Sequence, residues 1–486
     1  MAFLPIRVII SILGVYACAL VYTQRSAMSV AIVAMTTVDS KGNDNTTNNN
    51  QKPEFDWNEK LQGVILGSQF YLYIIVPTIA GRITDTFGAK WVNFSGAAVP
   101  CVLSLLTPIG VRYGGVGTLI AIRVIDGAFH GCVYASLFSL YTRWFPPNER
   151  VNANGSLFFG GSLGSTVMFA LAGWACETSV GWPMVYYINA VLYIPWMILW
   201  IYYCSNDPAS NARITQEELQ FIQNNIEHTT VVGENKKKRS TPWIHIFTSI
   251  PVLSSMFLKM CSGFGYFLLI TKMPSFFYNV LGIAIFKNGL FSASTTLCQG
   301  LCALLAAPLS NWIIKRFNLP VLIVRKVFQS IAAFGPCICL ALIPSMEDHA
   351  TVVIALLLLA MIAYGFFTGG EWSTGSGKYN FMMFLYTKYS TMEKFLILEY
   401  APNSAGVVFG FSNSLAFLMG VVAPFLVGIL LDAENSDNRH QWNMIMYITA
   451  AIYAVGPLPF FIFGTTKQQW WDKLVEFDEN QHLDKY

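Results

Sequence analysis

Two arginines lie inside long apolar stretches of this 486-residue chain. Arg25 interrupts the stretch 8–35, and Arg123 opens another at 123–140. In a bilayer core a charged side chain costs at least ~2.5–3.5 kcal/mol on insertion scales, and charges kept there usually serve a function. A fixed positive charge at membrane depth suits an anionic ligand. The two residues therefore predict a site for small anions, provided that the chain spans a membrane.

The composition is that of a membrane protein. The chain is 54% hydrophobic and 12% charged, with a mean hydropathy of +0.48, whereas soluble domains carry roughly 25% charged residues. We therefore expect a polytopic protein whose main surroundings are a lipid bilayer. The net charge of +3 gives no reason to expect nucleic acid as a partner. The ten cysteines form no CxxC pair in a loop, so neither a zinc site nor a disulfide framework is indicated. No metal ion or cofactor is expected.

The apolar segments are long enough for membrane-spanning helices, which need about 20 residues each. This length predicts twelve spans, at residues 8–35, 61–81, 91–109, 115–141, 154–176, 183–203, 251–278, 288–310, 326–344, 351–372, 406–430 and 443–465. The predicted fold class is thus an all-α polytopic membrane protein. It would comprise an N-terminal six-helix bundle (1–203), a cytoplasmic central loop (204–250), a C-terminal six-helix bundle (251–465) and a cytoplasmic tail (466–486).

The distribution of Lys and Arg predicts the orientation. Seventeen of them fall in the segments on the side of the termini and six in the opposite loops, and the positively charged side is normally cytoplasmic. Both termini are therefore predicted to be cytoplasmic. The loop 36–60 then faces outward or into a lumen, where Asn45-Thr46-Thr47 matches the acceptor pattern for N-glycosylation.

A short motif follows the second predicted span. Gly81, Asp85, Gly88 and Lys90 have the spacing of the GxxxDxxGxK/R signature, and the segment resembles the major facilitator superfamily. The glycines would allow a tight turn and close helix approach, and Asp85 could cap a helix and pair with a basic residue nearby. An eroded copy at 309–316, with Asn311 in place of the Asp, lies at the matching point of the second half, as an internal repeat predicts.

Several further segments, spread over nearly the whole chain, narrow the resemblance. The segments 144–150 (WFPPNER), 181–183, 242–251, 325–326 and 401–428 are similar to the anion:cation symporter family (solute carrier family 17). That family includes sialin, vesicular glutamate and nucleotide transporters, and sodium–phosphate cotransporters. The resemblance implies transport of organic or inorganic anions, driven by protons, sodium or membrane voltage. It implies a location in the plasma membrane or in an endolysosomal or vesicular membrane.

The fourth predicted span carries the most chemistry. Arg123, Asp126, Gly127, His130 and Gly131 follow one another at helical spacing and would share one face, with the glycines admitting a neighbouring helix. In the resembled family an arginine of this helix binds substrate, and Arg123 matches it; Arg25 matches a second one in the first span. The alternative is that each arginine is only buried and satisfied, by carbonyl groups or by an acid such as Asp126.

His130 departs from the family pattern, because many relatives have a glutamate there that is expected to take part in proton coupling. Histidine titrates near pH 6.5, so it could still carry a proton, but protonation would add a positive charge instead of removing a negative one. His130 and Asp126 are therefore the candidates for coupling. The alternative for His130 is a neutral side chain hydrogen-bonded inside the bundle.

Other polar residues of the spans are weaker candidates. Lys259 is a possible cavity residue of the seventh span, whereas Lys272 and also Lys259 could simply extend toward the membrane surface. Glu371 is a possible cavity residue of the tenth span, and aromatic residues such as Tyr71 and Tyr73 more often serve packing than substrate contact. Residues 375–398 separate two segments that are almost continuous in the family pattern. This unusual insertion is hypothesised to be a retained intron; the alternative is a genuine cytoplasmic or interfacial loop.

These observations predict a secondary active transporter that binds a small anion between the two bundles and exposes it alternately to each side. Its partners would be the anionic substrate and a coupling proton or sodium ion. The alternative is a membrane receptor or scaffold that keeps the transporter fold without transport. No nucleophile–base pair or metal-ligand cluster occurs in the spans, so an enzyme is not expected.

Overall fold

We describe a computed structural model that covers residues 4–36, 53–230, 243–346, 348–370, 405–432, 438–465 and 469–470. Residues 78, 147, 148, 151, 152, 226–230, 405–407 and 409 are described by their backbone alone. Three of the sequence predictions fall outside these residues: the glycosylation pattern at Asn45, the cavity candidate Glu371 and the insertion 375–398.

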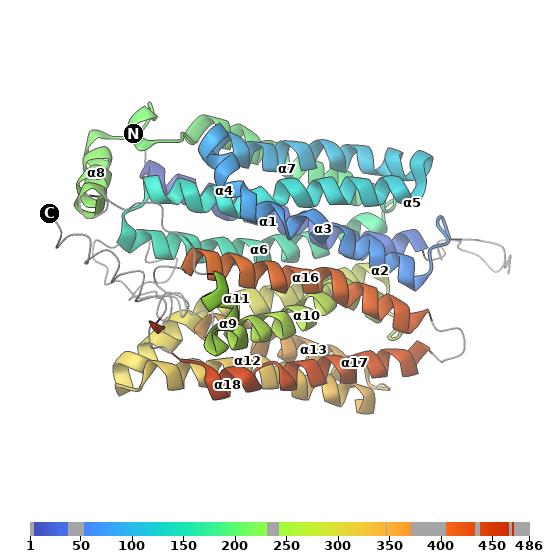
Figure 1. Cartoon of the computed structure of the whole chain (residues 1–486). Coiled ribbons are helices and arrows are strands. Elements are labelled where there is room, and N and C mark those ends of the chain that lie inside the picture. Colours follow the sequence, from blue (N-terminus) through green and yellow to red (C-terminus); the bar gives the residue numbers. More distant parts are fainter. Residues whose placement is uncertain are drawn as a thin grey trace.

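The described residues form helices and connecting turns, with no strand among them. The first group contains α1 (Ile6–Thr36), α2 (Glu59–Ser68), α3 (Phe70–Tyr73), α4 (Val76–Phe87), α5 (Ala89–Trp144), α6 (Pro147–Cys176) and α7 (Pro183–Tyr203). Three short elements follow, η1 (Pro208–Ser210), α8 (Gln216–Thr230) and α9 (Trp243–Thr248). The second group contains α10 (Ile250–Asn279), α11 (Ile285–Phe317), α12 (Val321–Leu342), η2 (Ile343–Met346), α13 (Ala350–Gly365), η3 (Phe366–Gly369), α16 (Ala405–Leu431), α17 (Asn438–Val455) and α18 (Leu458–Phe463). Figure 1 shows the two groups as bundles that lie against each other along their length.

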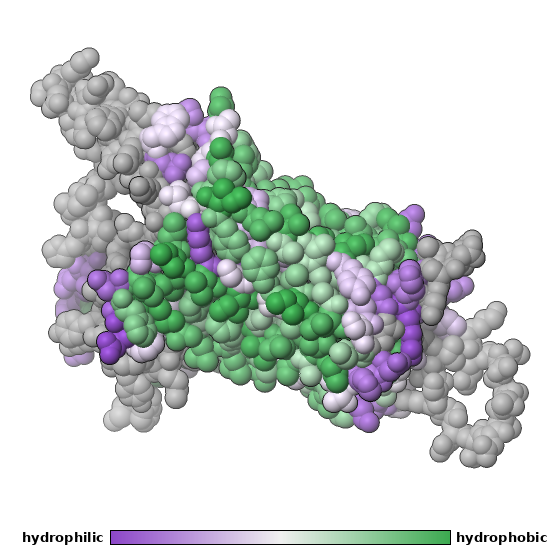
Figure 2. Space-filling view, turned by 90° about the horizontal axis from the view of Figure 1, so that it is seen from below, coloured by the Kyte–Doolittle hydropathy of each residue, from purple (hydrophilic) through white to green (hydrophobic). Residues whose placement is uncertain are grey.

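The predicted all-α membrane fold is confirmed. Ten helices of the described part are long and apolar enough to cross a membrane, and Figure 2 shows an apolar belt between two polar ends. Helix α5 contains two predicted spans, 91–109 and 115–141, which join at Gly115, where φ is 62° and favours glycine. The predicted span 61–81 is divided among α2, α3 and α4. The number of twelve spans stays a prediction, as do the domain boundaries.

Small residues let the two bundles approach closely near Glu59. A Cβ atom added to Gly63 of α2 would overlap the carbonyl oxygen of Pro424 in α16, and one added to Gly67 would lie 3.2 Å from the Cα of Val421. In the same way, α6 meets α11 where a Cβ on Gly173 would lie 3.0 Å from the Cα of Gly289. Backbones in such close contact gain van der Waals packing without a side chain between them. We call this part of the interface the Glu59 end.

In the loop that carries the Gly81–Lys90 signature, Asp85 does not have the position that helix capping requires. Gly88 adopts φ 82° at the N-cap of α5, and Asp85 lies exposed in the last turn of α4. The capping bond comes instead from Asn206, whose Oδ1 accepts from the backbone N–H of Lys90 at 2.9 Å. The Lys90 ammonium donates to the carbonyl oxygen of Ile201 at 3.1 Å. The possibility that Asp85 caps this helix is therefore wrong, because the side chain of Asn206, 116 residues further along the chain than Lys90, occupies the helix end. Gly81 is exposed.

Candidate functional site

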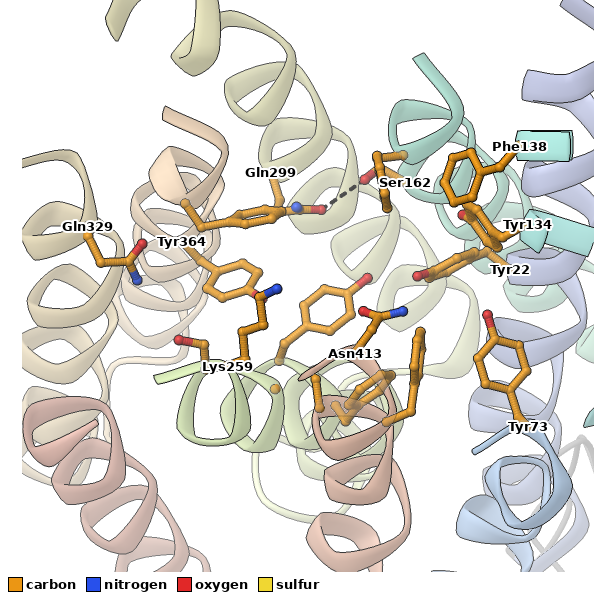
Figure 3. Close-up of a pocket in the computed structure, with 18 residues that line it drawn as sticks. Tyr22, Tyr73, Tyr134, Phe138, Ser162, Lys259, Gln299, Gln329, Tyr364 and Asn413 are labelled. Carbon is orange, nitrogen blue, oxygen red and sulfur yellow. Dashed lines mark hydrogen bonds between the residues drawn. The ribbon is translucent and has the colours of Figure 1, made fainter. Parts of the chain in front are cut away.

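A cavity of about 140 Å³ lies between the two bundles. Its lining combines ten aromatic rings with a few polar groups and one lysine, as Figure 3 shows. The lining residues are Tyr22, Tyr73, Tyr134, Phe138, Phe158, Ser162, Lys259, Ser262, Gly263, Tyr266, Phe267, Gln299, Gln329, Tyr364, Phe367, Asn413, Ala416 and Phe417. They come from both halves of the chain, so the cavity exists only when the bundles are assembled.

Lys259 is the charged residue among the described residues that line this cavity. Its side chain is buried, with 4% exposed, and in Figure 3 the ammonium points into the cavity toward Tyr364. Tyr22, Tyr73 and Tyr134 of the first bundle face it from the other side. The possibility that Lys259 extends to the membrane surface is therefore wrong for this structure, and Tyr73 lines the cavity in addition to packing.

Arg25 lies directly behind the cavity wall in a cage of aromatic rings. Its guanidinium carbon is 4.5 Å from the ring centroid of Tyr73, 4.7 Å from that of Tyr22 and 5.1 Å from that of Phe70. The fourth ring, Phe417 at 5.3 Å, comes from the second bundle. Such cation–π contacts stabilise a desolvated guanidinium. Among the described residues its three nitrogens have no hydrogen-bond partner, so the donors of a buried cation remain unused.

Arg123 is also buried, but its donors are occupied. Its Nε donates to the carbonyl oxygen of Ile65 at 2.7 Å, and its Nη2 donates to that of Leu66 at 3.1 Å. These carbonyls belong to the end of α2, where a helix leaves acceptors unsatisfied and carries partial negative charge. The break after α2 therefore supplies the partners. The backbone at Gln69 can come this close to α5 because Gly127 has no side chain. A Cβ atom at Gly127 would overlap the carbonyl oxygen of Gln69.

His130 is connected to Arg123 through Gln69. The Gln69 Oε1 accepts from Arg123 Nη2 at 3.4 Å, and its Nε2 lies 3.3 Å from His130 Nδ1. The other ring nitrogen, Nε2, is 3.2 Å from the hydroxyl of Tyr193, which donates its own proton to Leu20. This pattern suits a neutral imidazole that carries its proton on Nε2 and accepts from Gln69 at Nδ1. These hydrogen bonds agree with the alternative of a neutral side chain inside the bundle, and the role of His130 in coupling stays a prediction.

Asp126 bonds to α1 instead of to Arg123. Its Oδ2 accepts from Gln24 Nε2 at 2.8 Å, while its Oδ1 is buried without a hydrogen-bond partner among the described residues. The Oε1 of Gln24 in turn accepts from Ser104 Oγ at 3.0 Å and from the side-chain amide of Asn189. The alternative that Asp126 satisfies Arg123 is therefore not what the structure shows.

Lys272 corrects a further expectation. Its side chain is completely buried, and its ammonium lies 2.7 Å from Glu59 Oε2. Lys272 belongs to α10 of the second bundle and Glu59 to α2 of the first, so this ion pair joins the bundles at the Glu59 end. Its ammonium is thus paired with a carboxylate inside the interface and is not exposed to solvent.

The structure brings together the substrate-binding and coupling candidates that the sequence selected. Arg25 and Arg123 border one small space of about 10 Å³, and the large cavity adjoins it because Tyr22 and Phe267 line both. Sequence analysis missed Gln24 and Gln69, which connect the candidates. Both are polar residues inside apolar spans, and this property could have identified them from the sequence.

Two helical bundles with a cavity between them, buried cations at their interface and an apolar outer belt define a multi-pass membrane transporter. The family model of the Major Facilitator Superfamily matches residues 14–387. The chain belongs to this superfamily.

Proteins named as transporters are similar to this chain over nearly its whole length. The chain is 29% identical to a Drosophila ananassae protein that is named as an inorganic phosphate cotransporter, over 95% of this chain and 93% of the relative. It is 26% identical to human sialin over 95% of this chain and 90% of the relative. It is 28% identical to vesicular glutamate transporter 3 of Danio rerio over 98% and 76%. The resemblance to solute carrier family 17 is thereby confirmed, and the transporter interpretation is favoured over a receptor or scaffold.

Solved structures share the fold at lower identity. A bacterial homologue of the human lysosomal transporter Spinster, in an inward-facing and unoccupied conformation, superimposes with a TM-score of 0.67. The two sequences are 13% identical, and the superposition covers 95% of this chain and 98% of the bacterial protein. The xylose transporter XylE from E. coli, in an inward open conformation, gives a TM-score of 0.61 at 13% identity, with 92% of this chain and 95% of that protein covered.

Proposed function

We propose that this transporter carries small anions across its membrane by alternating access, driven by protons, sodium or membrane potential. The observation that carries the proposal is the pair of buried cations at the bundle interface, Lys259 in the cavity wall and Arg25 behind it. An anion in the cavity would gain from both charges in surroundings of low dielectric constant. The proposal includes no catalytic step.

The two arginines would act differently. Arg25 has unused donors among the described residues, so a rotation of Tyr22 or Tyr73 would let its planar fork grip a carboxylate or phosphate group. Arg123 already donates to the end of α2. It would bind substrate only after α2 has moved relative to α5, and until then it holds the break between α2 and α3 in place.

His130 and Asp126 would provide coupling. A second proton on His130 would place an N–H at Nδ1, opposite the amide N–H of Gln69. Gln69 would have to turn its oxygen toward His130, and its N–H groups would then oppose Arg123. Protonation of His130 would in this way loosen the bond between Gln69 and Arg123. Asp126, with one oxygen lacking a partner among the described residues, would take up the proton in a parallel route.

The remaining assignments follow the resemblance. Gly81, Asp85, Gly88 and Lys90 would serve the conformational change at the cytoplasmic side, where both termini would also lie. Glu371 would belong to the cavity, and Asn45 would carry a glycan on the opposite side. The membrane would be the plasma membrane or an endolysosomal or vesicular one.

The first test is uptake of labelled phosphate, glutamate, sialic acid, urate and nucleotides into proteoliposomes, with a pH gradient and a voltage imposed separately. Wild type is compared with Arg25→Gln, Arg123→Ala and the control Arg112→Gln, whose side chain is 52% exposed. Loss of a charge-assisted bond worth about 1.5–3 kcal/mol predicts a decrease of roughly 10- to 100-fold for Arg25→Gln and none for the control. Equal uptake by wild type and Arg25→Gln would refute its role, and absence of uptake under every gradient would refute the function.

The coupling proposal is tested by His130→Gln, which keeps a polar side chain of similar reach. We expect the pH dependence of uptake to flatten while the apparent affinity for the anion changes less. A pH profile identical to that of the wild type would exclude His130 as a coupling group.

A further inference from the structure

The residues of the cavity wall indicate the chemical class of the substrate as well as the sign of its charge. Ten of its eighteen lining residues are aromatic, and three of them form a continuous stack on the second bundle. Tyr266 stacks on Tyr364 with centroids 5.3 Å apart and planes at 16°, and Tyr364 stacks on Phe367 at 5.0 Å and 24°. The ammonium of Lys259 points toward the same Tyr364. The ammonium of Lys259 therefore lies beside a wall of nearly parallel rings.

We propose that the substrate is an aromatic organic monoanion and that inorganic phosphate is a poor substrate. Its carboxylate or sulfonate group would lie on the ammonium of Lys259, and its flat ring would continue the stack formed by Tyr364 and Phe367. This inference rests on the proposed anion transport and names the substrate class of the same site. It differs from the name carried by the Drosophila ananassae relative.

The electrostatics of the rings favour this assignment. The face of an aromatic ring is negative and its edge positive, so rings attract another ring in an offset or edge-on arrangement. A phosphate ion has charge on all sides and would meet negative faces over much of the wall. It would also lose most of its hydration while the cavity lining offers Lys259 as its charged group among the described residues. Burying a polar ion without full compensation is unfavourable.

The polar groups of the lining suit an organic body with one or two polar substituents. Gln299, whose oxygen accepts from Ser162 Oγ at 3.0 Å, and Asn413 lie among the rings in Figure 3. These amides are neutral, so they select for hydrogen-bonding substituents and not for a second charge. The first bundle adds the hydroxyl groups of Tyr22, Tyr73 and Tyr134 on the opposite wall.

The experiment compares three anions in proteoliposomes: labelled benzenesulfonate, cyclohexanesulfonate and inorganic phosphate. The two sulfonates are permanently charged, do not cross lipid as neutral acids, and match in size while differing in aromaticity. We expect an initial uptake rate for benzenesulfonate at least ten-fold above those of the other two. Transport of phosphate that benzenesulfonate neither inhibits nor replaces would overturn the proposal and leave anion transport standing. Absence of uptake of every anion would refute both.

Two variants separate the roles of ring and charge. Phe367→Leu keeps an apolar side chain but removes the last ring of the stack, and we expect it to weaken benzenesulfonate transport about three- to ten-fold without changing that of cyclohexanesulfonate. Lys259→Gln should weaken both sulfonates by at least ten-fold. Phe425→Leu, on a residue that is 38% exposed, serves as the control. An equal response of the two sulfonates to Phe367→Leu would show that the ring stack does not select the substrate.

Discussion

The interface between the bundles has two parts that are built on opposite principles. At the Glu59 end, glycines bring backbone against backbone, and the Lys272–Glu59 ion pair closes the contact. Around Lys259, large aromatic side chains hold the bundles apart and leave a cavity of about 140 Å³. Asn58 adds to the closed part, because its Nδ2 donates to Asp432 Oδ2 at 3.2 Å.

The difference shows how one interface can both bind and seal. Glycine contacts depend on close distance, so they are lost almost completely once the backbones separate. An aromatic wall can admit a ligand and repack around it. If the bundles rock, the Glu59 end is therefore the part that must open, and the cavity is the part that must keep contact with the substrate.

The largest effect should come from forcing the closed part open. In Gly63→Leu the new side chain would meet the backbone of Pro424, which cannot turn away as a side chain can. We expect uptake to fall at least ten-fold because a conformation of the cycle is lost. Gly117→Leu is the control, since Gly117 is exposed and an added Cβ meets no described atom within 4 Å. Comparable uptake by Gly63→Leu and wild type would remove closure at this contact from the transport cycle.

The ion pair should matter less, and in an asymmetric way. Glu59→Gln would strand an ammonium that is 0% exposed, whereas Lys272→Gln would leave a carboxylate that is 22% exposed. We expect Glu59→Gln to destabilise the protein by about 2 kcal/mol, below the ~3–5 kcal/mol of a fully buried pair, and Lys272→Gln by less. The apparent unfolding temperature measures the first effect, and hydrogen exchange of α2 and α16 measures the opening.

The double variant Glu59→Gln/Lys272→Gln is the control for this prediction. It removes both charges, so most of the stability should return while exchange at α2 stays faster than in the wild type. A larger loss for Lys272→Gln than for Glu59→Gln would contradict the burial argument.

The smallest effect is expected for an ion pair inside one bundle. Arg7 of α1 lies 3.1 Å from Glu149 of α6, on the cytoplasmic side of the predicted spans. Burial raises the pKa of the Glu149 carboxyl, Arg7 opposes the rise and Glu218 adds to it. The folded protein therefore holds this proton more tightly than the unfolded chain, and the associated stability is lost as pH rises through the folded pKa.

Glu149→Gln should accordingly stabilise the protein slightly at pH 7, by about 0.5 kcal/mol, and the gain should vanish as pH falls toward 4.5. Uptake should not change, because the pair does not cross the bundle interface. Unfolding temperatures measured at several pH values check the sign. A gain that grows toward acid pH would contradict it, and reduced uptake would show that this pair also takes part in the conformational change.

Much of the fold followed from properties that are local in the chain. A charge inside an apolar run, such as Arg25 or Arg123, must be buried wherever the helix lies, and the spacing of Gly127 and Gly131 marks a face that a neighbour can approach. The partners were not local. Arg123 bonds to carbonyls 57 and 58 residues away, and Lys90 is capped from a distance of 116 residues.

The sequence by itself determined that the chain is a helical membrane protein of two halves with cations at membrane depth, because hydropathy and charge act on each segment separately. Only the tertiary structure decided that Arg123 is satisfied by a helix end while Arg25 is enclosed by rings. It also decided that Lys259 rather than either arginine faces the cavity, and that Lys272 joins the bundles. These outcomes depend on which helices meet and at what distance. A contact between residues more than 200 positions apart, as for Lys272 and Glu59, cannot be predicted from the composition of either segment alone.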